Sequence, residues 1–268
     1  MAIKGALSPS ALGKFLDCPR DFWLEKKGLK GYRGIMASIP NAIDACLKDY
    51  HDEHRMKGLL PPEVAVQIPG GKAFTELVKL NRWRSLGQGI SATIDGTAIM
   101  GLLDDLLLFE DGTAAGMDYK SNKSPRTPDY AANFYGHQLA LYNLLLEANG
   151  FKVRPKGYLS FWSPKPLIGS GDAASRTTQF PFDCTVHEID ADPASAREII
   201  KNAVACLAGS LPEPDSDCEL CNYVKARGLR MTEIARVARE NAKQSMEIVA
   251  HAPPPVDAAP IPAAEPAK

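Results

Sequence analysis

The stretch from Gly101 to Lys120, reading GLLDDLLLFEDGTAAGMDYK, constrains the fold more than any other part of the chain. It contains two apolar runs, Leu102 to Phe109 and Ala114 to Tyr119, joined by a short segment that holds an Asp-Gly dipeptide. An Asp-Gly dipeptide between apolar runs is a strong signal for a β-hairpin. The sequence therefore predicts two antiparallel strands here.

Both predicted strands carry charged residues where a purely structural strand would carry apolar ones. Asp118 and Lys120 are two positions apart and share a face of the second strand, while Tyr119 points to the other face. On the first strand, Asp104 or Asp105, but not both, can point toward the face of Asp118, because adjacent residues face opposite ways. We expect Asp105 to be a solvated or structural acid rather than a ligand.

Converging carboxylates on this hairpin would favour a bound metal ion. Two carboxylates at one spot repel each other and are costly to desolvate unless a cation lies between them. Carboxylate oxygens without a nearby cysteine or histidine favour Mg²⁺ or Mn²⁺ over Zn²⁺. A lysine beside such a site can orient a water molecule or stabilise charge on a phosphate. The alternative interpretation is a solvated hairpin whose acids merely face water.

Three motifs in this order resemble the signature of the PD-(D/E)XK nuclease superfamily, in its RecB-, AddB- and Cas4-like branch. The motifs are Gly101-x-x-Asp104, Asp118-Tyr119-Lys120 and Gln138-x-x-x-Tyr142. The resemblance implies that Asp104, Asp118 and the Tyr119 carbonyl bind the metal and that Lys120 assists the attacking water. It also implies that Gln138 and Tyr142, on the helix that follows, line the active site with these catalytic residues.

The same resemblance implies a fold and an activity. The fold is of the α/β class, with a restriction-endonuclease-like core in which a mixed central β-sheet is flanked by α-helices. The activity is that of a Mg²⁺- or Mn²⁺-dependent deoxyribonuclease, with an exonuclease of DNA repair or recombination favoured and a nuclease of CRISPR adaptation as an alternative. Two other classes remain open: a catalytically inactive DNA-binding or scaffold module of the same fold, and a metal hydrolase acting on RNA or small molecules.

A helix predicted from Ile39 to Gly58 bears on the metal site. In this family, a helix at this point usually supplies a histidine ligand. Asp44 stands at that position here, so the resemblance implies Asp44 as a metal ligand and shifts the site toward an all-oxygen shell. His51 and His54 are alternative occupants of that role, but their segment is strongly charged and we expect both to be solvated.

Three cysteines match part of a second family feature. Cys218 and Cys221 have a metal-ligand spacing. In iron–sulfur members of the branch, such a pair joins an N-terminal cysteine, here Cys18, and one later cysteine to hold a [4Fe–4S] cluster. Arg227 occupies the later position in this chain. Because a cluster usually has four thiolate ligands, two interpretations remain: a cysteine trio without a cluster, and a cluster or zinc ion completed by another ligand.

Two basic segments are candidates for DNA contact. In the first, Arg82 and Arg84 flank Trp83, an arrangement that suits stacking on a nucleotide or contact with phosphates. The alternative is a tryptophan that anchors a loop between surface charges. In the second, Lys123 and Arg126 lie in the polar loop after the proposed site, where they could touch phosphate or simply be solvated.

The remaining elements complete the predicted fold. The Asp-Gly turn at Asp95 predicts a further strand pair, which would extend the hairpin into a three-stranded antiparallel meander. A strand after the helix of Gln138 predicts a strand–helix–strand unit, and another strand follows a flexible loop. The predicted domains are a nuclease-like domain over residues 1–228, a C-terminal helix over 229–250 and a disordered tail rich in proline and alanine over 251–268.

Charge and hydropathy set limits on partners. The formal net charge of the 268 residues is −1, so contact with DNA must come from local patches and not from a global basic field. No apolar run approaches the roughly 20 residues needed to cross a bilayer, and the N-terminus lacks the apolar core of a signal peptide. We therefore expect no membrane partner and a cytoplasmic location, with DNA as the partner.

Overall fold

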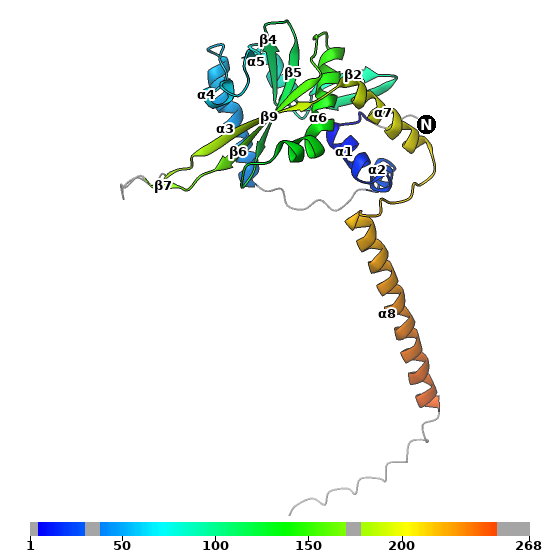
Figure 1. Cartoon of the computed structure of the whole chain (residues 1–268). Coiled ribbons are helices and arrows are strands. Elements are labelled where there is room, and N and C mark those ends of the chain that lie inside the picture. The colour runs from blue at the N-terminus through cyan, green and yellow to red at the C-terminus, as the bar shows by residue number, and fades with distance from the viewer. Residues whose placement is uncertain (1–4, 30–37, 170–177, 251–268) are drawn as a thin grey trace, which may run out of the picture. The chain divides into compact units, whose positions relative to one another are not determined.

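The computed structural model describes residues 5–29, 38–169 and 178–250 (Figure 1). The chain divides into two compact units, residues 1–215 and residues 216–268. The predicted boundary at residue 228 lies inside a helix of the second unit. The predicted disordered tail and the flexible loop before the last strand lie largely outside the described residues. Within the described residues, no helix is long and apolar enough to cross a membrane.

A mixed five-stranded sheet forms the centre of the first unit, in the order β1-β4-β5-β6-β9. Strands β4 (Asp105–Phe109) and β5 (Ala114–Ser121) pair antiparallel, which confirms the predicted hairpin. Strand β6 (Lys156–Pro164) runs parallel to β5, and the connection between them contains helix α6 (Pro128–Ala148), as the strand–helix–strand prediction requires. The two edge strands are also antiparallel to their neighbours: β1 (Gly71–Ala73) pairs with β4, and β9 (Phe182–Asp190) pairs with β6.

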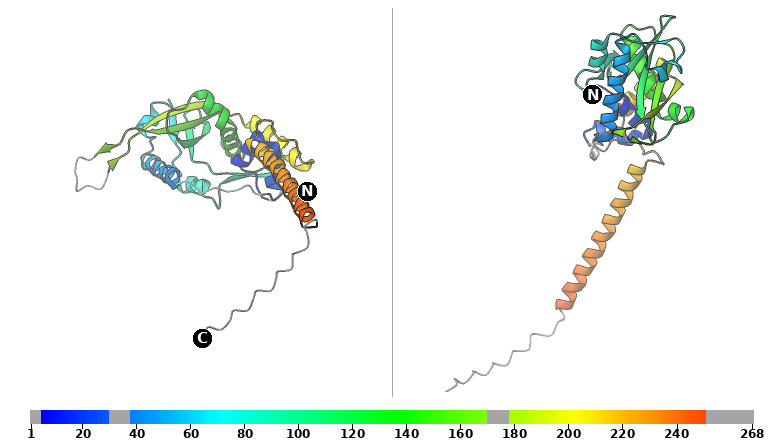
Figure 2. Two further views of the ribbon diagram at one scale, coloured as in Figure 1. Left: turned by 90° about the horizontal axis from the view of Figure 1, so that it is seen from below. Right: turned by 90° about the vertical axis from the view of Figure 1, so that its left-hand side faces the viewer.

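Helices cover both faces of this sheet (Figures 1 and 2). One face packs against α6 and α7 (Pro193–Ala208), together with α1 (Pro9–Asp17) and α2 (Pro19–Lys26). The other face packs against α3 (Ser38–Arg55) and the short helix α4 (Pro62–Ala65). Because side chains alternate along a strand, β5 contributes Ala115, Met117 and Tyr119 to the α3 side. The fold is thus the predicted restriction-endonuclease-like arrangement of a mixed sheet flanked by helices.

Helix ends follow local sequence chemistry. Ser8 caps α1 and accepts a hydrogen bond from the Ala11 backbone N–H at 3.2 Å, and Pro9 follows at the first helical position. Thr127 caps α6 in the same way, with the Tyr130 N–H as donor. Just after the C-terminal end of α6, Gly150 adopts φ +91°, a left-handed conformation that glycine reaches without a Cβ clash. These caps fix where the helices around the central sheet begin and end.

The predicted three-stranded meander is wrong. Strands β2 (Ile90–Ile94) and β3 (Thr97–Gly101) form a separate two-stranded sheet within the described residues, and β3 also makes an isolated bridge with Leu7. Leu102, Leu103 and Asp104 separate β3 from β4, and the strand that flanks β4 opposite β5 is β1. The Asp-Gly turn predicted the β2–β3 hairpin correctly, but a turn signal does not say which sheet a hairpin joins.

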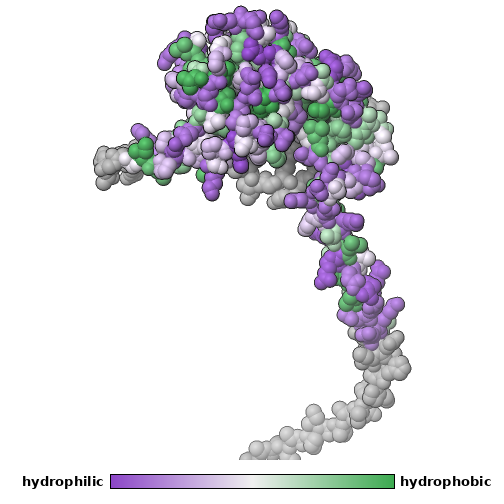
Figure 3. All heavy atoms as spheres, viewed as in Figure 1, coloured by the Kyte–Doolittle hydropathy of each residue, from purple (hydrophilic) through white to green (hydrophobic). Residues whose placement is uncertain are grey.

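Two smaller elements complete the first unit. Helix α5 (Leu77–Arg84) follows β1 and leads toward β2. The short strands β7 (Ile168–Gly169) and β8 (Thr178–Gln179) pair antiparallel between β6 and β9, and both figures show them extending away from the helices. The face of this unit seen in Figure 3 is mostly hydrophilic, with scattered apolar patches.

The second unit is one long helix in its described part. Helix α8 spans Glu219–Ala250, so it begins before the helix that the sequence predicted to start after residue 228. Apolar side chains alternate with hydrophilic ones along its surface (Figure 3). Its ion pairs are local: Arg236 bonds to Glu233 and Glu240, at the spacings that place side chains on neighbouring turns.

Candidate active site

The end of strand β5 carries the two central residues of the candidate site. Asp118 and Lys120 project from the same face, as their spacing predicts, and their side chains form an ion pair. Asp118 is 2% exposed, whereas Lys120 is partly open to solvent. Tyr119, between them, points to the α3 side and is buried. The hairpin therefore presents one charged pair toward α6 at a place that solvent reaches from one side.

Helix α6 supplies polar side chains to this pair. The Gln138 amide donates to Asp118 Oδ1 at 3.0 Å and to the Tyr142 hydroxyl at 2.8 Å. Tyr142 in turn donates to the Leu102 carbonyl at 2.6 Å. Gln138 and Tyr142 are four residues apart on the same face of the helix, which is why one hydrogen-bond chain can include both. The chain ties α6 to the segment just before β4.

Gly101 has a steric reason to be glycine. A Cβ at this position would lie 2.9 Å from Cε1 of Tyr142. Any side chain would therefore displace the tyrosine ring and, through it, the hydrogen bond of Gln138. The glycine of the first motif and the tyrosine of the third are parts of one packing contact.

Asp104 approaches the site from the segment between β3 and β4. Its carboxylate accepts a hydrogen bond from the Tyr119 backbone N–H at 3.2 Å, which places it beside the second strand near Asp118. Its backbone carbonyl accepts from Arg84 Nε at 2.7 Å. Asp105 points to the opposite side of the sheet, as the alternation of side chains predicts for adjacent residues.

Lys48 on α3 joins the site, and the sequence did not indicate it. Its ammonium lies 3.0 Å from Asp104 Oδ1 and 2.7 Å from Asp44 Oδ2. Asp44, the residue expected to stand in for the family histidine, is one helical turn before Lys48, and 45% of its side chain is exposed. Its carboxylate thus reaches Asp104 through the Lys48 ammonium. The four-residue spacing of Asp44 and Lys48 on a helix could have suggested their mutual contact, but not the contact of Lys48 with Asp104.

The charges of the site shift one another's ionisation. Burial raises the pKa of Asp118; the Lys120 ammonium opposes this effect and the Asp104 carboxylate adds to it. Burial alone would lower the pKa of Lys120, but the carboxylates of Asp118 and Asp104 raise it above its ordinary value. The pKa of Lys48 is raised for the same reason, with burial opposed by Asp104 and Asp44. The carboxylates of this site are therefore held close enough to interact strongly.

These residues fit a divalent cation. Asp104 and Asp118 offer hard carboxylate oxygens from two neighbouring segments, and their mutual repulsion is the condition that a bound cation relieves. No cysteine is among the residues that contact them in the described part of the chain, so the ligand chemistry matches Mg²⁺ or Mn²⁺ better than Zn²⁺. The Tyr119 backbone lies beside Asp104, as a carbonyl ligand from that residue requires.

A buried polar network supports the site from the α3 side. Asp105, which is fully buried, accepts hydrogen bonds from Arg55 Nη2 at 2.6 Å, from the Leu106 backbone N–H at 2.7 Å and from the Tyr119 hydroxyl. Burial alone would raise the pKa of Asp105, but the Arg55 guanidinium lowers it below its usual value. Asp105 was expected to be a solvated or a structural acid; its burial excludes the first role, and its bond to Arg55 supports the second. The network holds Tyr119, and with it the strand between Asp118 and Lys120, against α3.

His51 lies in this network, contrary to the expectation that it is solvated. It is 1% exposed, and its ring packs on Tyr119 with a centroid distance of 4.2 Å. Burial lowers its pKa to about 4. The charged residues around His51 in the sequence misled the prediction, because Arg55 and Asp52 are themselves drawn into buried or half-buried ion pairs. His54 is half-buried, and its ring bonds to the Tyr50 carbonyl.

The first basic segment proposed for DNA contact is largely internal, so that interpretation needs correction. Trp83 is 7% exposed and stacks on Phe74 in the core, where no nucleotide base can reach its face. Arg84 is occupied by Asp52 and by the Asp104 carbonyl. Arg82 alone of the three is exposed. The alternative interpretation, a tryptophan that anchors this segment, is the one the structure supports.

The second basic segment lies closer to the candidate site. Lys123 is exposed and Arg126 is half-buried in the loop between β5 and α6. The Arg126 guanidinium lies over the ring of Tyr130, 4.6 Å from its centroid, and its backbone carbonyl bonds to His187 at 2.7 Å. The loop is therefore anchored, with Lys123 free to extend toward solvent.

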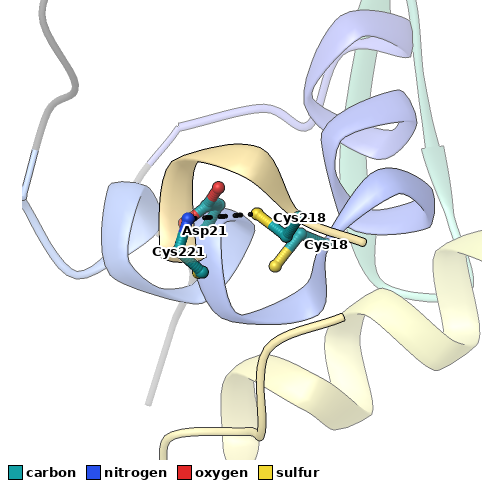
Figure 4. A group of neighbouring side chains, drawn as sticks. All are labelled: Cys18, Asp21, Cys218 and Cys221. Atoms are coloured by element: carbon teal, nitrogen blue, oxygen red, sulfur yellow. Dashed lines mark hydrogen bonds between the residues drawn. The ribbon is translucent and has the colours of Figure 1, made fainter. Parts of the chain in front are cut away.

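The three cysteines proposed as metal ligands from the sequence are divided between the units, with Cys18 in the first and Cys218 and Cys221 in the second. In the first unit, Cys18 precedes α2 and Asp21 lies in its first turn. In the second unit, Cys218 precedes α8 and Cys221 lies in its first turn, with the Cys221 backbone N–H donating to Cys218 Sγ at 3.4 Å (Figure 4). Cys18 is buried and the other three are half-buried. Each pair has the three-residue spacing that brings two ligands to one side of a helix start.

Comparison with known proteins identifies the family. The family model described as PD-(D/E)XK nuclease superfamily matches residues 6–226. No curated protein matches the sequence. Among solved structures, one matching chain is that of the crystal structure of SSO0001, at 14% identity and a TM-score of 0.39, covering 83% of this chain and 84% of that chain. Since the family model covers most of the sequence, the chain belongs to the PD-(D/E)XK nuclease superfamily.

Proposed function

We propose that this chain is a metal-dependent deoxyribonuclease that hydrolyses phosphodiester bonds at the site of Asp104, Asp118 and Lys120. The observation that carries the proposal is the convergence of these side chains, with Gln138, on one partly open face at the end of β5. A storage site for a metal ion would not need a lysine within reach of the substrate. Membership of a nuclease superfamily supports the class of reaction.

In this proposal, Asp104, Asp118 and the Tyr119 carbonyl would hold Mg²⁺ or Mn²⁺, and Asp44, whose carboxylate pairs with Lys48, would contribute a further oxygen ligand. The ion, when bound, would polarise the phosphate and lower the pKa of a bound water. Lys120, as an ammonium, can donate hydrogen bonds to the attacking water and to a phosphate oxygen. Gln138 keeps Asp118 oriented through its 3.0 Å hydrogen bond. The Tyr142 hydroxyl holds the Gln138 amide in this orientation by accepting its second hydrogen bond.

The resemblance to the RecB-, AddB- and Cas4-like branch supports the finer assignment. It favours DNA as the substrate, an exonuclease of repair or recombination as the role, and hence the cytoplasm as the location. It also supports a metal centre on Cys18, Cys218 and Cys221. Thiolate ligands suit zinc as well as an iron–sulfur cluster.

One observation favours a second candidate, a catalytically inactive DNA-binding module of the same fold. The Lys48 ammonium already pairs with both Asp104 and Asp44, which lessens the demand of these carboxylates for a metal ion. Such a module would bind DNA equally well with and without metal and would not cut it.

The experiment that tests the proposal is cleavage of end-labelled DNA, linear and circular, single- and double-stranded, with Mg²⁺, Mn²⁺ or EDTA. The proposal predicts cutting that requires metal and is lost in Asp118→Asn. A matched control is Asp190→Asn, which changes an aspartate with 89% side-chain exposure at the end of β9. Cutting of linear but not circular DNA would support an exonuclease. Bound but uncut DNA under every condition would favour the inactive module.

A further inference from the structure

One ridge of α6 connects the candidate active site to an exposed aromatic surface. The ridge consists of Tyr130, Phe134, Gln138 and Tyr142, which follow one another at four-residue intervals. Residues at this interval lie on the same side of a helix, about 6 Å apart along its axis. Gln138 contacts Asp118, so Phe134 stands one helical turn from a residue that touches the proposed metal ligand.

The aromatic part of this surface is continuous. Tyr130 and Phe134 pack together with their ring centroids 4.4 Å apart, and Tyr130 lies 6.3 Å from Tyr135. Tyr135 in turn lies under the Lys120 ammonium, which is 4.9 Å from its ring centroid. We call Tyr130, Phe134 and Tyr135 the aromatic ladder. Its inner end is at the proposed catalytic lysine, and its outer end faces solvent.

The ladder is exposed where packing does not require an aromatic ring. Phe134 is 58% exposed and lies in the first half of α6, whereas residues 139–146 of the same helix are buried. Tyr135 packs against the core through Phe161, so the base of the ladder is held in place. The Thr127 cap and the contact of Arg126 with Tyr130 hold its outer part. A rigid, exposed ring beside an active site is a surface on which a planar group can stack.

Charge around the ladder selects the class of planar group. Arg126 lies over Tyr130, Lys123 is exposed in the same loop, and Lys120 lies at the inner end. Aromatic rings interleaved with basic side chains bind single-stranded nucleic acid, because the rings stack on bases and the cations contact phosphates. An apolar peptide would gain nothing from the three cations. Since Phe134 is one turn from Gln138, the stacked base would belong to a nucleotide close to the bond that is cut.

We propose that the exposed face of Phe134 stacks on an unpaired base of the DNA strand, so that the site takes single-stranded or frayed DNA in preference to intact duplex. Base pairing keeps both faces of a duplex base stacked on its neighbours, so only an unpaired base is available to the ring. This inference deepens the proposed function and relies on it for the identity of the substrate.

Binding in the absence of cleavage tests the inference. The protein carries Asp118→Asn and is titrated in EDTA against fluorescein-labelled oligothymidine and, separately, a blunt duplex, with anisotropy as the signal. The added variants are Phe134→Ala, Phe134→Leu and Phe134→Trp, whose folding is compared by thermal melting. Truncation of one stacking ring corresponds to a loss of between about 5- and 150-fold in affinity.

We expect Phe134→Ala and Phe134→Leu to weaken binding of the single strand by such a factor, with Phe134→Trp at or above the parent. Duplex binding should change by less than about threefold, since phosphate contacts dominate it. If Phe134→Leu binds the single strand as tightly as the parent, the inference is overturned, because that result indicates an apolar docking surface. Unchanged binding in Phe134→Ala, or no binding of the single strand by the parent, would also overturn it.

The outcome is separable from that of the proposed function. If the stacking order holds but the protein with Asp118 intact never cuts DNA, the inference stands and the nuclease proposal fails. If metal-dependent cutting occurs but Phe134 variants bind normally, the nuclease proposal stands and the inference fails.

Discussion

Replacing Arg55 with methionine should destabilise the first unit severely, because it would leave a charge buried without its partner. Arg55 and Asp105 are 1% and 0% exposed in their side chains, and their charged atoms are 2.6 Å apart. Arg55 also donates to the Phe74 carbonyl at 2.6 Å and to Asp52 at 3.1 Å. In Arg55→Met, a side chain of similar length fills the space, but Asp105 keeps its charge with only the Leu106 N–H and the Tyr119 hydroxyl as donors.

The expected loss is about 3–5 kcal/mol in the free energy of unfolding, the usual result of removing one member of a buried ion pair. Against a total of about 5–15 kcal/mol for a domain, this is a large fraction. With a denaturant dependence of about 1–3 kcal/mol per molar urea, the midpoint should fall by roughly 1–5 M. Equilibrium urea unfolding followed by tryptophan fluorescence measures it, since Trp83 lies in the core of this unit.

Two further variants make the reasoning refutable. Arg197→Met breaks an exposed ion pair with Asp95 and should cost no more than about 1 kcal/mol. Arg55→Met combined with Asp105→Asn removes the charge that the single variant strands, so it should be more stable than Arg55→Met by at least about 1 kcal/mol. A loss in Arg55→Met no larger than that in Arg197→Met, or a double variant no more stable than the single, would refute this account of the network.

Three other predictions address the site and its surroundings. The pKa of His51 in the folded protein is about 4, below the ordinary value of 6.5. As the pH falls from 6.5 to 4, the imidazole is therefore protonated in the unfolded chain but not in the folded one, and the free energy of unfolding should fall by up to roughly 3 kcal/mol. His51→Phe should flatten that part of the pH profile in urea unfolding, and an unchanged slope would show that another group causes it. Lys48→Met should raise the affinity for Mn²⁺ by a few-fold to about tenfold, because the Lys48 ammonium competes with the metal ion for Asp104. Electron paramagnetic resonance measures this affinity, and weaker binding would mean that Lys48 positions the carboxylate instead. Purified protein should contain iron or zinc by mass spectrometry that Cys218→Ser loses, and a metal-free parent would favour the cluster-free cysteine trio.

The site was predictable from the sequence where it depends on local periodicity. Alternation along a strand was enough to separate Asp118 and Lys120 from Tyr119, and Asp104 from Asp105, and the structure shows those opposite faces. The four-residue spacing on α6 likewise placed Gln138 beside Tyr142. Each of these relations follows from the geometry of one secondary-structure element.

What the sequence could not show depends on how elements meet. Lys48 reaches Asp104 only because α3 packs against one face of the sheet, and no pattern within α3 indicates that contact. His51 was expected in solvent because its neighbours are charged, yet Arg55 is buried by pairing with a residue fifty positions away. From the sequence, Trp83 could either stack on a nucleotide or anchor its segment, and only its stacking on Phe74 shows that it lies in the core. Whether such side chains are buried depends on contacts between residues far apart in the sequence, and local composition does not indicate those contacts.

The central claim is that Lys120 assists phosphodiester hydrolysis beside the metal ion that Asp104 and Asp118 would hold, and a single-turnover measurement tests it most directly. The rate of DNA cleavage at saturating enzyme and metal is compared between the parent, Lys120→Ala and Lys201→Ala, a control at an exposed lysine of α7. Folding is checked by urea unfolding and substrate binding by anisotropy. The account predicts that Lys120→Ala binds DNA and folds but cuts about 100- to 10,000-fold more slowly, while Lys201→Ala cuts like the parent. A folded Lys120→Ala that cuts at the parental rate would contradict it.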